Sequence, residues 1–201
     1  MNISTIVIDD FLENPMWVRQ SALAVLDYAK HEEFYPGVRT DPADRDYQGY
    51  VKAKFESILN EEILEWDDSR NIYTGEWQTN DNAKFQLCVE GDETWIHVDP
   101  NEWTAILYLT PNAPADSGTG IYRHKESGVY ICTQDEIKTL DGEWELITFV
   151  GNVFNRVIMF KGNLCHRSVT PGFGHDKDTG RLTQVFFFNT NYDRIGKENG
   201  K

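Results

Sequence analysis

Three histidines in this sequence are each followed, two positions later, by an acidic residue, which is a spacing found in metal-binding pairs. The three stretches are His31-Glu32-Glu33, His97-Val98-Asp99 and His124-Lys125-Glu126. Imidazole nitrogens and carboxylate oxygens are ligands that zinc and iron take from proteins. Such a match is a weak signal by itself, so the flanking residues must decide which pair belongs to a site.

Two of the three pairs have simpler explanations. His31 ends an expected helix, where a cationic side chain interacts favourably with the helix dipole. His124 lies in the charged stretch RHKES, which is typical of an exposed turn. His97 differs, because it lies in the strand-like run TWIHVDP, and Pro100 forces Asp99 into an extended conformation. Strand alternation then places the side chains of His97 and Asp99 on one face.

Two interpretations of this pair stay open on the tripeptide alone. Either it binds a metal, or Asp99 orients His97 as a partly buried pair beneath Trp95. His166, in the later strand-like run LCHRSVT, supplies a second histidine. Two histidines and one carboxylate with open positions form the facial triad of non-haem Fe(II) oxygenases. Zinc could take the same three ligands with a water as the fourth.

An arginine begins the apolar strand-like run RLTQVFFFN. Arg181 shares a face of this run with Thr183. A cation on the buried face of a strand requires an anionic partner, and a planar guanidinium matches a carboxylate with two hydrogen bonds. The sequence therefore predicts a carboxylate beside Arg181.

The elements that must position these residues begin with an expected strand and two helices. STIVIDDF (4–11) has the β-branched composition of a short strand, and Asn14-Pro15 suits the first turn of a helix that runs to about Lys30. A second helix is expected over about 47–62. The connector between them, residues 34–46, is rich in Pro, Gly and Asp, and loops of this length are often functional.

After about residue 70, short strand-like runs alternate with Gly, Pro, Asn and Asp. The expected strands are NIYTGEWQ, KFQLCVEG, TWIHVDP, EWTAILYLTP, GTGIYRH, VYICT, NRVIMFKG, LCHRSVT and RLTQVFFFN. This spacing predicts a mainly β (α+β) fold of the jelly-roll or cupin class, with 133–151 as an insertion between strands. No composition shift divides the chain, so we expect one domain over 1–201, with 1–70 as helical support and 71–190 as the β core.

Composition excludes several classes of partner. A chain of 201 residues with 40% apolar content can build a single core, while a net charge of −14 disfavours nucleic acids and anionic membranes. Neither a secretory leader nor a membrane-spanning run is expected. Three widely spaced cysteines, Cys88, Cys132 and Cys165, suit the core of a cytoplasmic protein. The sequence does not indicate an oligomeric state.

From about Lys84 to Asn189 the motifs resemble the iron(II)- and 2-oxoglutarate-dependent oxygenases, especially small prolyl-4-hydroxylase-like members of bacterial or phage type. The matching motifs are IHVD, TAILYLTP followed by SGTGIYRH, GNLCHRSVTP and GRLTQVFFF. This resemblance implies a double-stranded β-helix with N-terminal helices packed on its sheet. Arg181 stands where prolyl hydroxylases usually carry lysine, which makes the chain more similar to arginine-using relatives and weakens the case for proline as the substrate.

The resemblance also implies roles for individual residues. His97, Asp99 and His166 would bind Fe(II), and Arg181 would clamp the far carboxylate of 2-oxoglutarate. Tyr108 matches a tyrosine that often hydrogen-bonds this co-substrate, and Thr183 matches a hydroxyl that frequently assists the arginine. Tyr108 also has a simpler interpretation as a core aromatic residue, and Thr183 as a good strand former.

The implied activity is a dioxygenase that uses O2 to hydroxylate a C–H bond, with formation of succinate and CO2. The primary substrate is not identified, and a peptide or protein side chain, an amino acid and a small metabolite are all compatible. Trp95, Trp103 and the loop 34–46 are candidates for its entrance. Two alternatives stay open: a non-catalytic cupin-like module that binds a metal or ligand, and a zinc-dependent enzyme on the same barrel.

Overall fold

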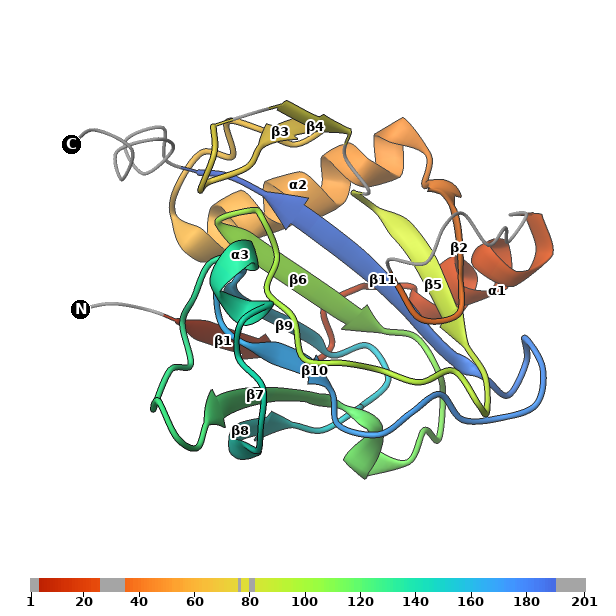
Figure 1. The fold of residues 1–201 in the computed structure, drawn as a ribbon. Helices are drawn as coiled ribbons and strands as arrows, with labels where there is room; N and C mark the ends of the chain where they lie inside the picture. Colours follow the sequence, from red (N-terminus) through yellow and green to blue (C-terminus); the bar gives the residue numbers. More distant parts are fainter. Residues whose placement is uncertain (1–3, 26–34, 76, 80–81, 191–201) are drawn as a thin grey trace.

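The computed structural model describes residues 4–25, 35–75, 77–79 and 82–190, whose fold is shown in Figure 1. Six strands form an antiparallel sheet, called here the major sheet, in the order β1-β9-β6-β11-β5-β2. Its strands are β1 (Thr5–Ile8), β2 (Val38–Pro42), β5 (Lys84–Cys88), β6 (Trp103–Tyr108), β9 (Val157–Lys161) and β11 (Arg181–Phe188). Because β11 pairs with β5 on one side and β6 on the other, its apolar sequence suits a strand that is covered on both faces.

A second antiparallel sheet, called here the minor sheet, has the order β10-β7-β8. Its strands are β7 (Thr119–His124), β8 (Trp144–Val150) and β10 (His166–Ser168), while β3 (Asp68–Arg70) and β4 (Trp77–Thr79) form a separate hairpin. One apolar cluster joins the two sheets, since it contains Ile158 and Phe160 of β9 together with Ile121 of β7. The mainly β class expected from the sequence is confirmed.

The two longer helices, α1 (Pro15–Val25) and α2 (Arg45–Leu59), pack on the face of the major sheet that is turned away from the minor sheet. Two short helices, η1 (Ala115–Ser117) and α3 (Gln134–Ile137), lie in later connections between strands. The ring of Phe55 in α2 lies 5.3 Å from Phe186 and 5.4 Å from Phe188 of β11, measured between ring centroids. Among the described residues, no helix is long and apolar enough to cross a membrane.

Helix boundaries follow local signals that the sequence contains. The first helix begins at Pro15 as expected, and its expected extension to about Lys30 runs beyond Val25 into residues outside the described part of the chain. The second helix starts earlier than expected, because the side chain of Asp44 accepts hydrogen bonds from the backbone N–H groups of Asp46 and Tyr47. It ends at Asn60, which adopts a left-handed conformation.

Several expected strands and loops are wrong in detail. Residues 34–46, expected as a loop, contain β2, and residues 133–151, expected as an insertion, contain α3 and the edge strand β8. The run TWIHVDP forms no regular strand and contributes one isolated bridge, between His97 and His166. VYICT likewise contributes only the bridge from Ile131 to Leu164, and NIYTGEWQ reaches a strand only at its last two residues, in β4.

Alternation along β11 gives the two faces of the major sheet different roles. Leu182, Phe186 and Phe188 belong to the apolar core beneath the helices. The intervening residues, Arg181, Thr183, Val185 and Phe187, line a cavity on the other face. The three cysteines are buried and free, as expected of core residues.

Candidate metal centre

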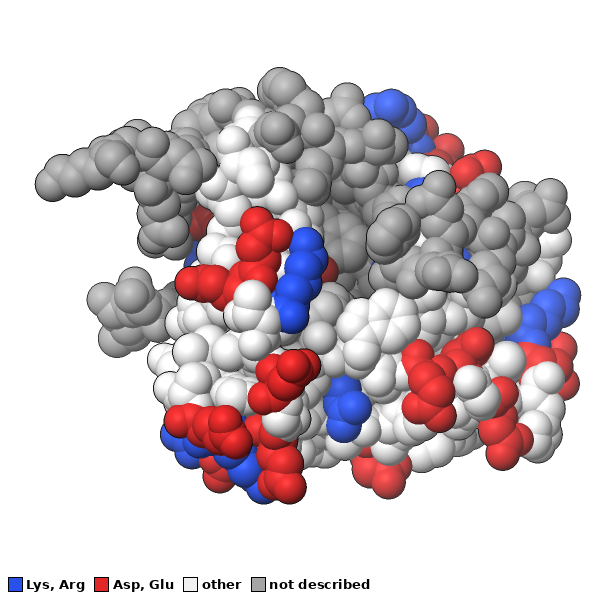
Figure 2. Space-filling model, in the orientation of Figure 1, with Lys and Arg blue, Asp and Glu red and all other residues white. Residues whose placement is uncertain are grey.

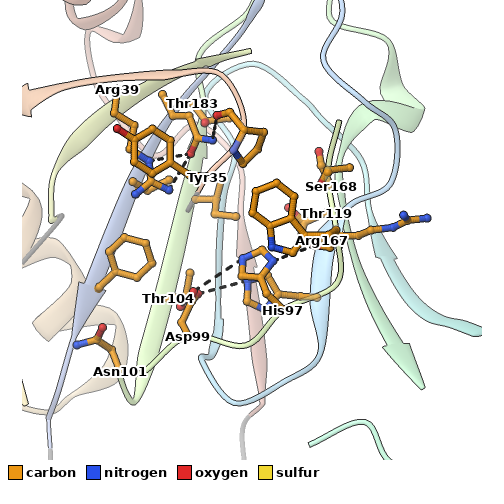
Figure 3. Close-up of a pocket in the computed structure, with 18 of the residues that line it drawn as sticks. Tyr35, Arg39, His97, Asp99, Asn101, Thr104, Thr119, Arg167, Ser168 and Thr183 are labelled. Carbon is orange, nitrogen blue, oxygen red and sulfur yellow. Dashed lines mark hydrogen bonds and ion pairs between the residues drawn. The ribbon is translucent and has the colours of Figure 1, made fainter. Parts of the chain in front are cut away.

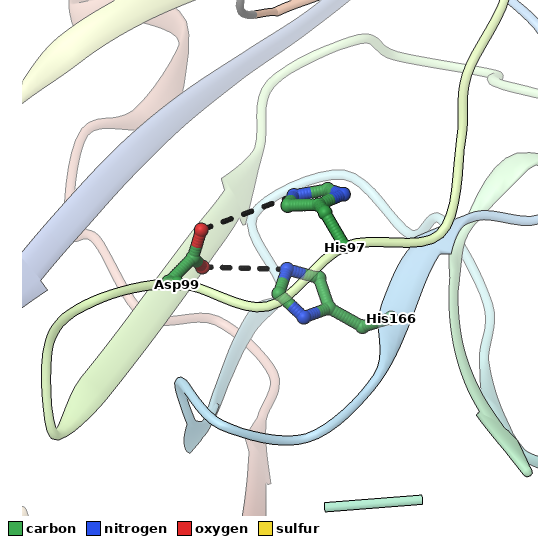
Figure 4. A group of neighbouring side chains, drawn as sticks. All are labelled: His97, Asp99 and His166. Atoms are coloured by element: carbon green, nitrogen blue, oxygen red, sulfur yellow. Dashed lines mark ion pairs between the residues drawn. The ribbon is translucent and has the colours of Figure 1, made fainter. Parts of the chain in front are cut away.

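Three side chains converge near the junction of the two sheets (Figure 4). His97, Asp99 and His166 each offer one ligand atom, and these atoms all lie within 4.8 Å of one another. Nε2 of His166 is 3.3 Å from Oδ2 of Asp99, and Nε2 of His97 is 3.9 Å from Oδ1. His166 and Asp99 are buried, whereas 41% of the His97 side chain is exposed. The cluster is therefore open on one side.

Backbone hydrogen bonds, not a continuous strand, hold the three residues together. The N–H of His97 donates to the carbonyl of His166 at 3.0 Å, and the reverse bond is 2.9 Å. The N–H of Asp99 donates to the carbonyl of Gly162 at 2.8 Å. Gly162 allows this close approach, because a Cβ at its position would lie 2.3 Å from the carbonyl oxygen of Asn101.

The hydrogen bonds of the two imidazole rings determine which nitrogen faces the cluster. Nδ1 of His97 lies 3.0 Å from the carbonyl oxygen of Trp95, and Nδ1 of His166 lies 2.8 Å from that of Leu164. A carbonyl only accepts hydrogen bonds, so in the neutral rings Nδ1 carries the proton and Nε2 presents a lone pair toward Asp99. Three electron-pair donors thus converge, an arrangement that a divalent cation stabilises.

A hydroxyl group fixes the carboxylate of the cluster. Oγ1 of Thr104, on β6, donates to Oδ2 of Asp99 at 2.5 Å. Burial alone would raise the pKa of Asp99, but the two histidines and Thr104 outweigh it and hold that pKa well below its usual value. Partial desolvation at the open side of the cluster and the neighbouring His166 lower the pKa of His97 to about 4. Near neutral pH His97 is therefore a neutral base beside an ionised Asp99, which are the forms that bind metals.

The cluster opens into a cavity of about 620 Å³ between the sheets (Figure 3). This volume is in the range of sites for small molecules. Its walls include Arg181 and Thr183 of β11 and Tyr108 of β6, so the six residues to which the resemblance assigns roles surround one space. Loop residues Tyr35 and Pro36 also line it, in accordance with the expectation for 34–46.

The two tryptophans expected at the entrance have different positions. Trp95 lines the cavity and is 44% exposed. Trp103 is only 3% exposed and belongs to the core beneath the helices, with Nζ of Lys161 3.6 Å from the centroid of its ring. The expectation for Trp103 is wrong, because strand β6 turns its side chain away from the cavity.

Arg181 is 5% exposed and lies at the wall formed by β10 and β11. Its Nη1 donates to the hydroxyl of Ser168 and to the carbonyl of Thr170. Among the described residues no carboxylate forms an ion pair with it. A buried guanidinium is costly without an anion, so its surroundings fit a negatively charged group that enters the cavity.

Tyr108 and Thr183 extend this wall as a polar surface. The hydroxyl of Tyr108 lies 2.7 Å from Oγ1 of Thr119 on β7. Burial raises the pKa of Tyr108 to about 12, so the phenol stays neutral and can donate a hydrogen bond. The partners Thr119, Thr104 and Ser168 were not predicted from the sequence, because these contacts depend on how distant strands pair. Strand alternation is a signal for two of them, since Thr104 shares a face with Tyr108 and Ser168 with His166.

The other two histidine pairs have different outcomes. His31 lies outside the described residues. His124, expected in an exposed turn, is 4% exposed at the end of β7. Its Nδ1 lies 2.9 Å from Oγ of Ser127, and its Nε2 lies 2.9 Å from the carbonyl oxygen of Asp141. The expectation of exposure is therefore wrong, but His124 is a structural residue and not a ligand.

Comparison with known proteins places the chain in a family. A family model described as "Family of unknown function (DUF6445)" matches residues 2–141. The chain belongs to this family. The matched range includes His97 and Asp99 of the candidate metal centre and ends before His166 and Arg181. No curated protein matches the sequence.

Solved structures show which fold this member of the DUF6445 family has. A prolyl hydroxylase from Trichoplax adhaerens, in complex with a hypoxia inducible factor peptide fragment, aligns with a TM-score of 0.53 and 13% identity over 95% of this chain and 86% of that chain. A prolyl-4-hydroxylase from Pseudomonas putida aligns with a TM-score of 0.47 and 14% identity over 94% and 93% of the two chains. HygX from Streptomyces hygroscopicus, with nickel, 2-oxoglutarate and hygromycin B bound, gives 0.49 and 12% over 94% and 84%. The first match confirms the double-stranded β-helix expected from the resemblance.

Proposed function

We propose that this chain is an Fe(II)- and 2-oxoglutarate-dependent dioxygenase that hydroxylates a C–H bond of a primary substrate. The strongest support is that two features, a cluster of metal-ligand atoms and a buried cation, occur within one cavity. A buried arginine without a carboxylate partner among the described residues shares that cavity with three converging metal-ligand atoms. A compound that binds a metal at one end and carries a carboxylate at the other would satisfy both.

His97, Asp99 and His166 are the residues that would hold Fe(II), since two imidazoles and one carboxylate are the ligand set of this class of iron site. Arg181 would bind the far carboxylate of 2-oxoglutarate, with Thr183 and Tyr108 beside it. Bound Fe(II), with 2-oxoglutarate and O2 as co-substrates, would supply the oxidation that yields succinate, CO2 and a hydroxylated product.

The protein's own groups prepare the site for these molecules. Thr104 orients Asp99, and the carbonyl partners of the two Nδ1 atoms keep both Nε2 lone pairs directed at the metal position. Ser168 and Thr170 hold Nη1 of Arg181, which leaves the rest of the guanidinium for a carboxylate. Ile106, Val185 and Phe187 line the same cavity with apolar surface that excludes water.

Arg181 also discriminates against the zinc-dependent alternative, and turnover of 2-oxoglutarate discriminates against the other. A plain zinc hydrolase has little use for a buried guanidinium in the metal cavity. A non-catalytic module could use it to bind a carboxylate ligand, but it would not consume 2-oxoglutarate. Formation of succinate therefore separates an oxygenase from a binding module.

The experiment that tests this proposal is the anaerobic addition of Fe(II) and 2-oxoglutarate to the purified protein. The wild-type protein is expected to develop a visible charge-transfer band, and His166→Ala is expected to lose it. His124→Ala is the matched control and should keep the band, because His124 lies outside the cavity. The absence of a band in the wild type, or a band in His166→Ala, would contradict the proposed site.

A further inference from the structure

Two of the three free cysteines lie side by side, although 33 positions separate them in the sequence. Sγ of Cys132 is 3.3 Å from Sγ of Cys165, and both side chains are buried. Backbone hydrogen bonds join the two segments. The N–H of Cys132 donates to the carbonyl of Asn163 at 3.1 Å, and the N–H of Cys165 donates to that of Tyr130 at 2.9 Å. The fold therefore holds the two thiols in contact.

The cysteine pair lies behind the candidate metal centre. Cys165 directly precedes His166, and Val98 lies between His97 and Asp99 in the sequence. Val98 belongs to one small apolar cluster with both cysteines, whereas the two histidines and Asp99 line the cavity. Because neighbouring residues of an extended segment point to opposite faces, the same two segments carry the metal-ligand atoms on one face and the apolar cluster on the other. Only the backbone of these segments separates the two sites.

Cys132 is the member of the pair that lies nearer to solvent. It is 5% exposed and follows the exposed residues Tyr130 and Ile131, whereas Cys165 is 0% exposed. The surface beside it is acidic, since helix α3 begins two residues later and Figure 2 shows acidic side chains over this helix. The whole chain also carries a net charge of −14. Anionic reagents are therefore repelled, and a small neutral oxidant such as hydrogen peroxide is favoured.

We infer that Cys132 and Cys165 form a redox-sensitive site, which hydrogen peroxide converts into a disulfide. The peroxide oxidises the thiol of Cys132 to a sulfenic acid and releases one water. Sγ of Cys165 then attacks that sulfur, the S–S bond forms, and the hydroxyl group leaves with the thiol proton as a second water. The two thiols lose two electrons and two protons, which reduce one peroxide to two waters. A dithiol such as dithiothreitol reverses the oxidation by thiol–disulfide exchange.

The disulfide acts on the metal centre through the backbone. Its formation draws the two sulfur atoms closer by more than about 1 Å. His166 follows Cys165 directly and exchanges two backbone hydrogen bonds with His97, so part of this movement reaches both imidazole rings. Metal sites tolerate deviations of only about 0.2 Å in ligand distance, and the oxidised protein therefore binds a metal less tightly. This coupling rests on the proposed function, because it uses the same metal centre, whereas the disulfide itself does not.

Peptide mapping of the full wild-type chain tests the site. The native protein is treated with hydrogen peroxide, the remaining thiols are alkylated in denaturant, and the protein is digested with trypsin. Each cysteine then lies on a separate peptide, Cys88 on 85–123, Cys132 on 126–138 and Cys165 on 162–167. Mass spectrometry is expected to find the second and third peptides linked, and to find them separate after dithiothreitol. Absence of this linkage, or linkage of either peptide to that of Cys88, would overturn the inference.

Variants provide matched controls for the effect of peroxide. Cys88 is also buried, but its Sγ lies 3.4 Å from the carbonyl oxygen of Pro36, away from the pair. Cys88→Ser is therefore expected to keep the linkage between peptides 126–138 and 162–167. Cys132→Ser keeps the size of the side chain and is expected to show no effect of peroxide on metal binding. Loss of the linkage in Cys88→Ser would contradict the assignment of the pair.

Binding of Mn(II) separates this inference from the proposed function. Mn(II) prefers oxygen ligands and has little affinity for thiols, so it probes the metal centre and not the cysteine pair. After removal of the peroxide, Mn(II) affinity measured by electron paramagnetic resonance is expected to be at least about tenfold lower than in the reduced protein, and to recover after reduction. Linked peptides with unchanged Mn(II) affinity would overturn the coupling. Linked peptides in a protein whose reduced form does not bind Mn(II) would contradict the proposed metal centre and the coupling, but would support the disulfide site.

Discussion

His97 and His124 have the same spacing to an acidic residue but opposite surroundings. Both ring nitrogens of His124 are within 2.9 Å of protein oxygens, those of Ser127 and Asp141. Only Nδ1 of His97 is occupied in this way, by the carbonyl of Trp95, and its Nε2 is directed at Asp99. The difference shows that a histidine can act as a ligand only where the fold leaves one nitrogen without a competing donor or acceptor.

The acidic members of the two pairs differ in the same way. Asp99 is buried and accepts a hydrogen bond from Thr104, while Glu126 is exposed. Among the described residues, a third candidate ligand lies beside the first pair and none beside the second, because β10 brings His166 into backbone contact with His97. The spacing between a histidine and an acidic residue therefore identifies candidate metal-binding pairs. The strand that pairs beside each candidate determines whether a third ligand is available.

The largest expected effect comes from removal of the carboxylate in the first pair. Asp99→Ala should weaken Zn(II) binding by more than about 100-fold, since loss of a ligand exceeds the 10–100-fold effect of losing a residue that only orients one. Isothermal titration calorimetry of the two proteins measures this difference. Glu126→Gln serves as the matched control, and retention of tight Zn(II) binding by Asp99→Ala would place the metal elsewhere.

A smaller loss is expected when the orientation of Asp99 is disturbed. Thr104→Val keeps the shape of the side chain but removes the hydroxyl that donates to Oδ2. Zn(II) affinity should fall about 10–100-fold, with the ligands themselves unchanged. Ser127→Ala removes the corresponding hydroxyl beside His124 and should leave Zn(II) affinity unchanged. Equal affinities for Thr104→Val and the wild type would show that Asp99 needs no such support.

The sequence predicted site residues correctly where a chemically distinctive residue type lies in a clear strand pattern. Arg181, at the start of an apolar strand, predicted a buried cation that needs an anion, and the structure buries it without a carboxylate partner among the described residues. The same alternation that turns Phe186 and Phe188 toward the helices turns Arg181 and Thr183 into the cavity. Residue type and the two-residue alternation of a strand were therefore sufficient to predict which residues of β11 line this wall of the cavity.

Other features depended on partners that sequence pattern does not indicate. Residues 133–151 were expected as an insertion but contain β8, an edge strand in which five of seven residues are exposed and which therefore lacks the apolar alternation of a buried strand. His124 was misjudged from its charged neighbours, yet Arg123 and Lys125 point outward to Glu145 and Glu143 while His124 points inward. Period-two alternation through YRHK was the signal that could have revealed this burial.

Removal of His124 should affect stability and leave the metal unaffected. His124→Ala removes a buried ring and its two hydrogen bonds, to the hydroxyl of Ser127 and the carbonyl of Asp141, at about 0.5–1.5 kcal/mol for each bond. Urea unfolding of the metal-free protein should show a lower midpoint, while calorimetry should show wild-type affinity for Zn(II). A His124→Ala variant with normal stability and weakened metal binding would show that His124 acts as a ligand and not as a structural residue.

The smallest effect is expected from the acidic residue that completes the second pair. Glu126 is exposed, and Glu126→Gln removes one surface charge without removing a buried contact. The free energy of unfolding should change by no more than about 0.5 kcal/mol, as for most surface substitutions. Zn(II) affinity should also equal that of the wild type. A clear loss of affinity would mean that the second His-x-acid pair takes part in metal binding, and the contrast between the two pairs would then be invalid.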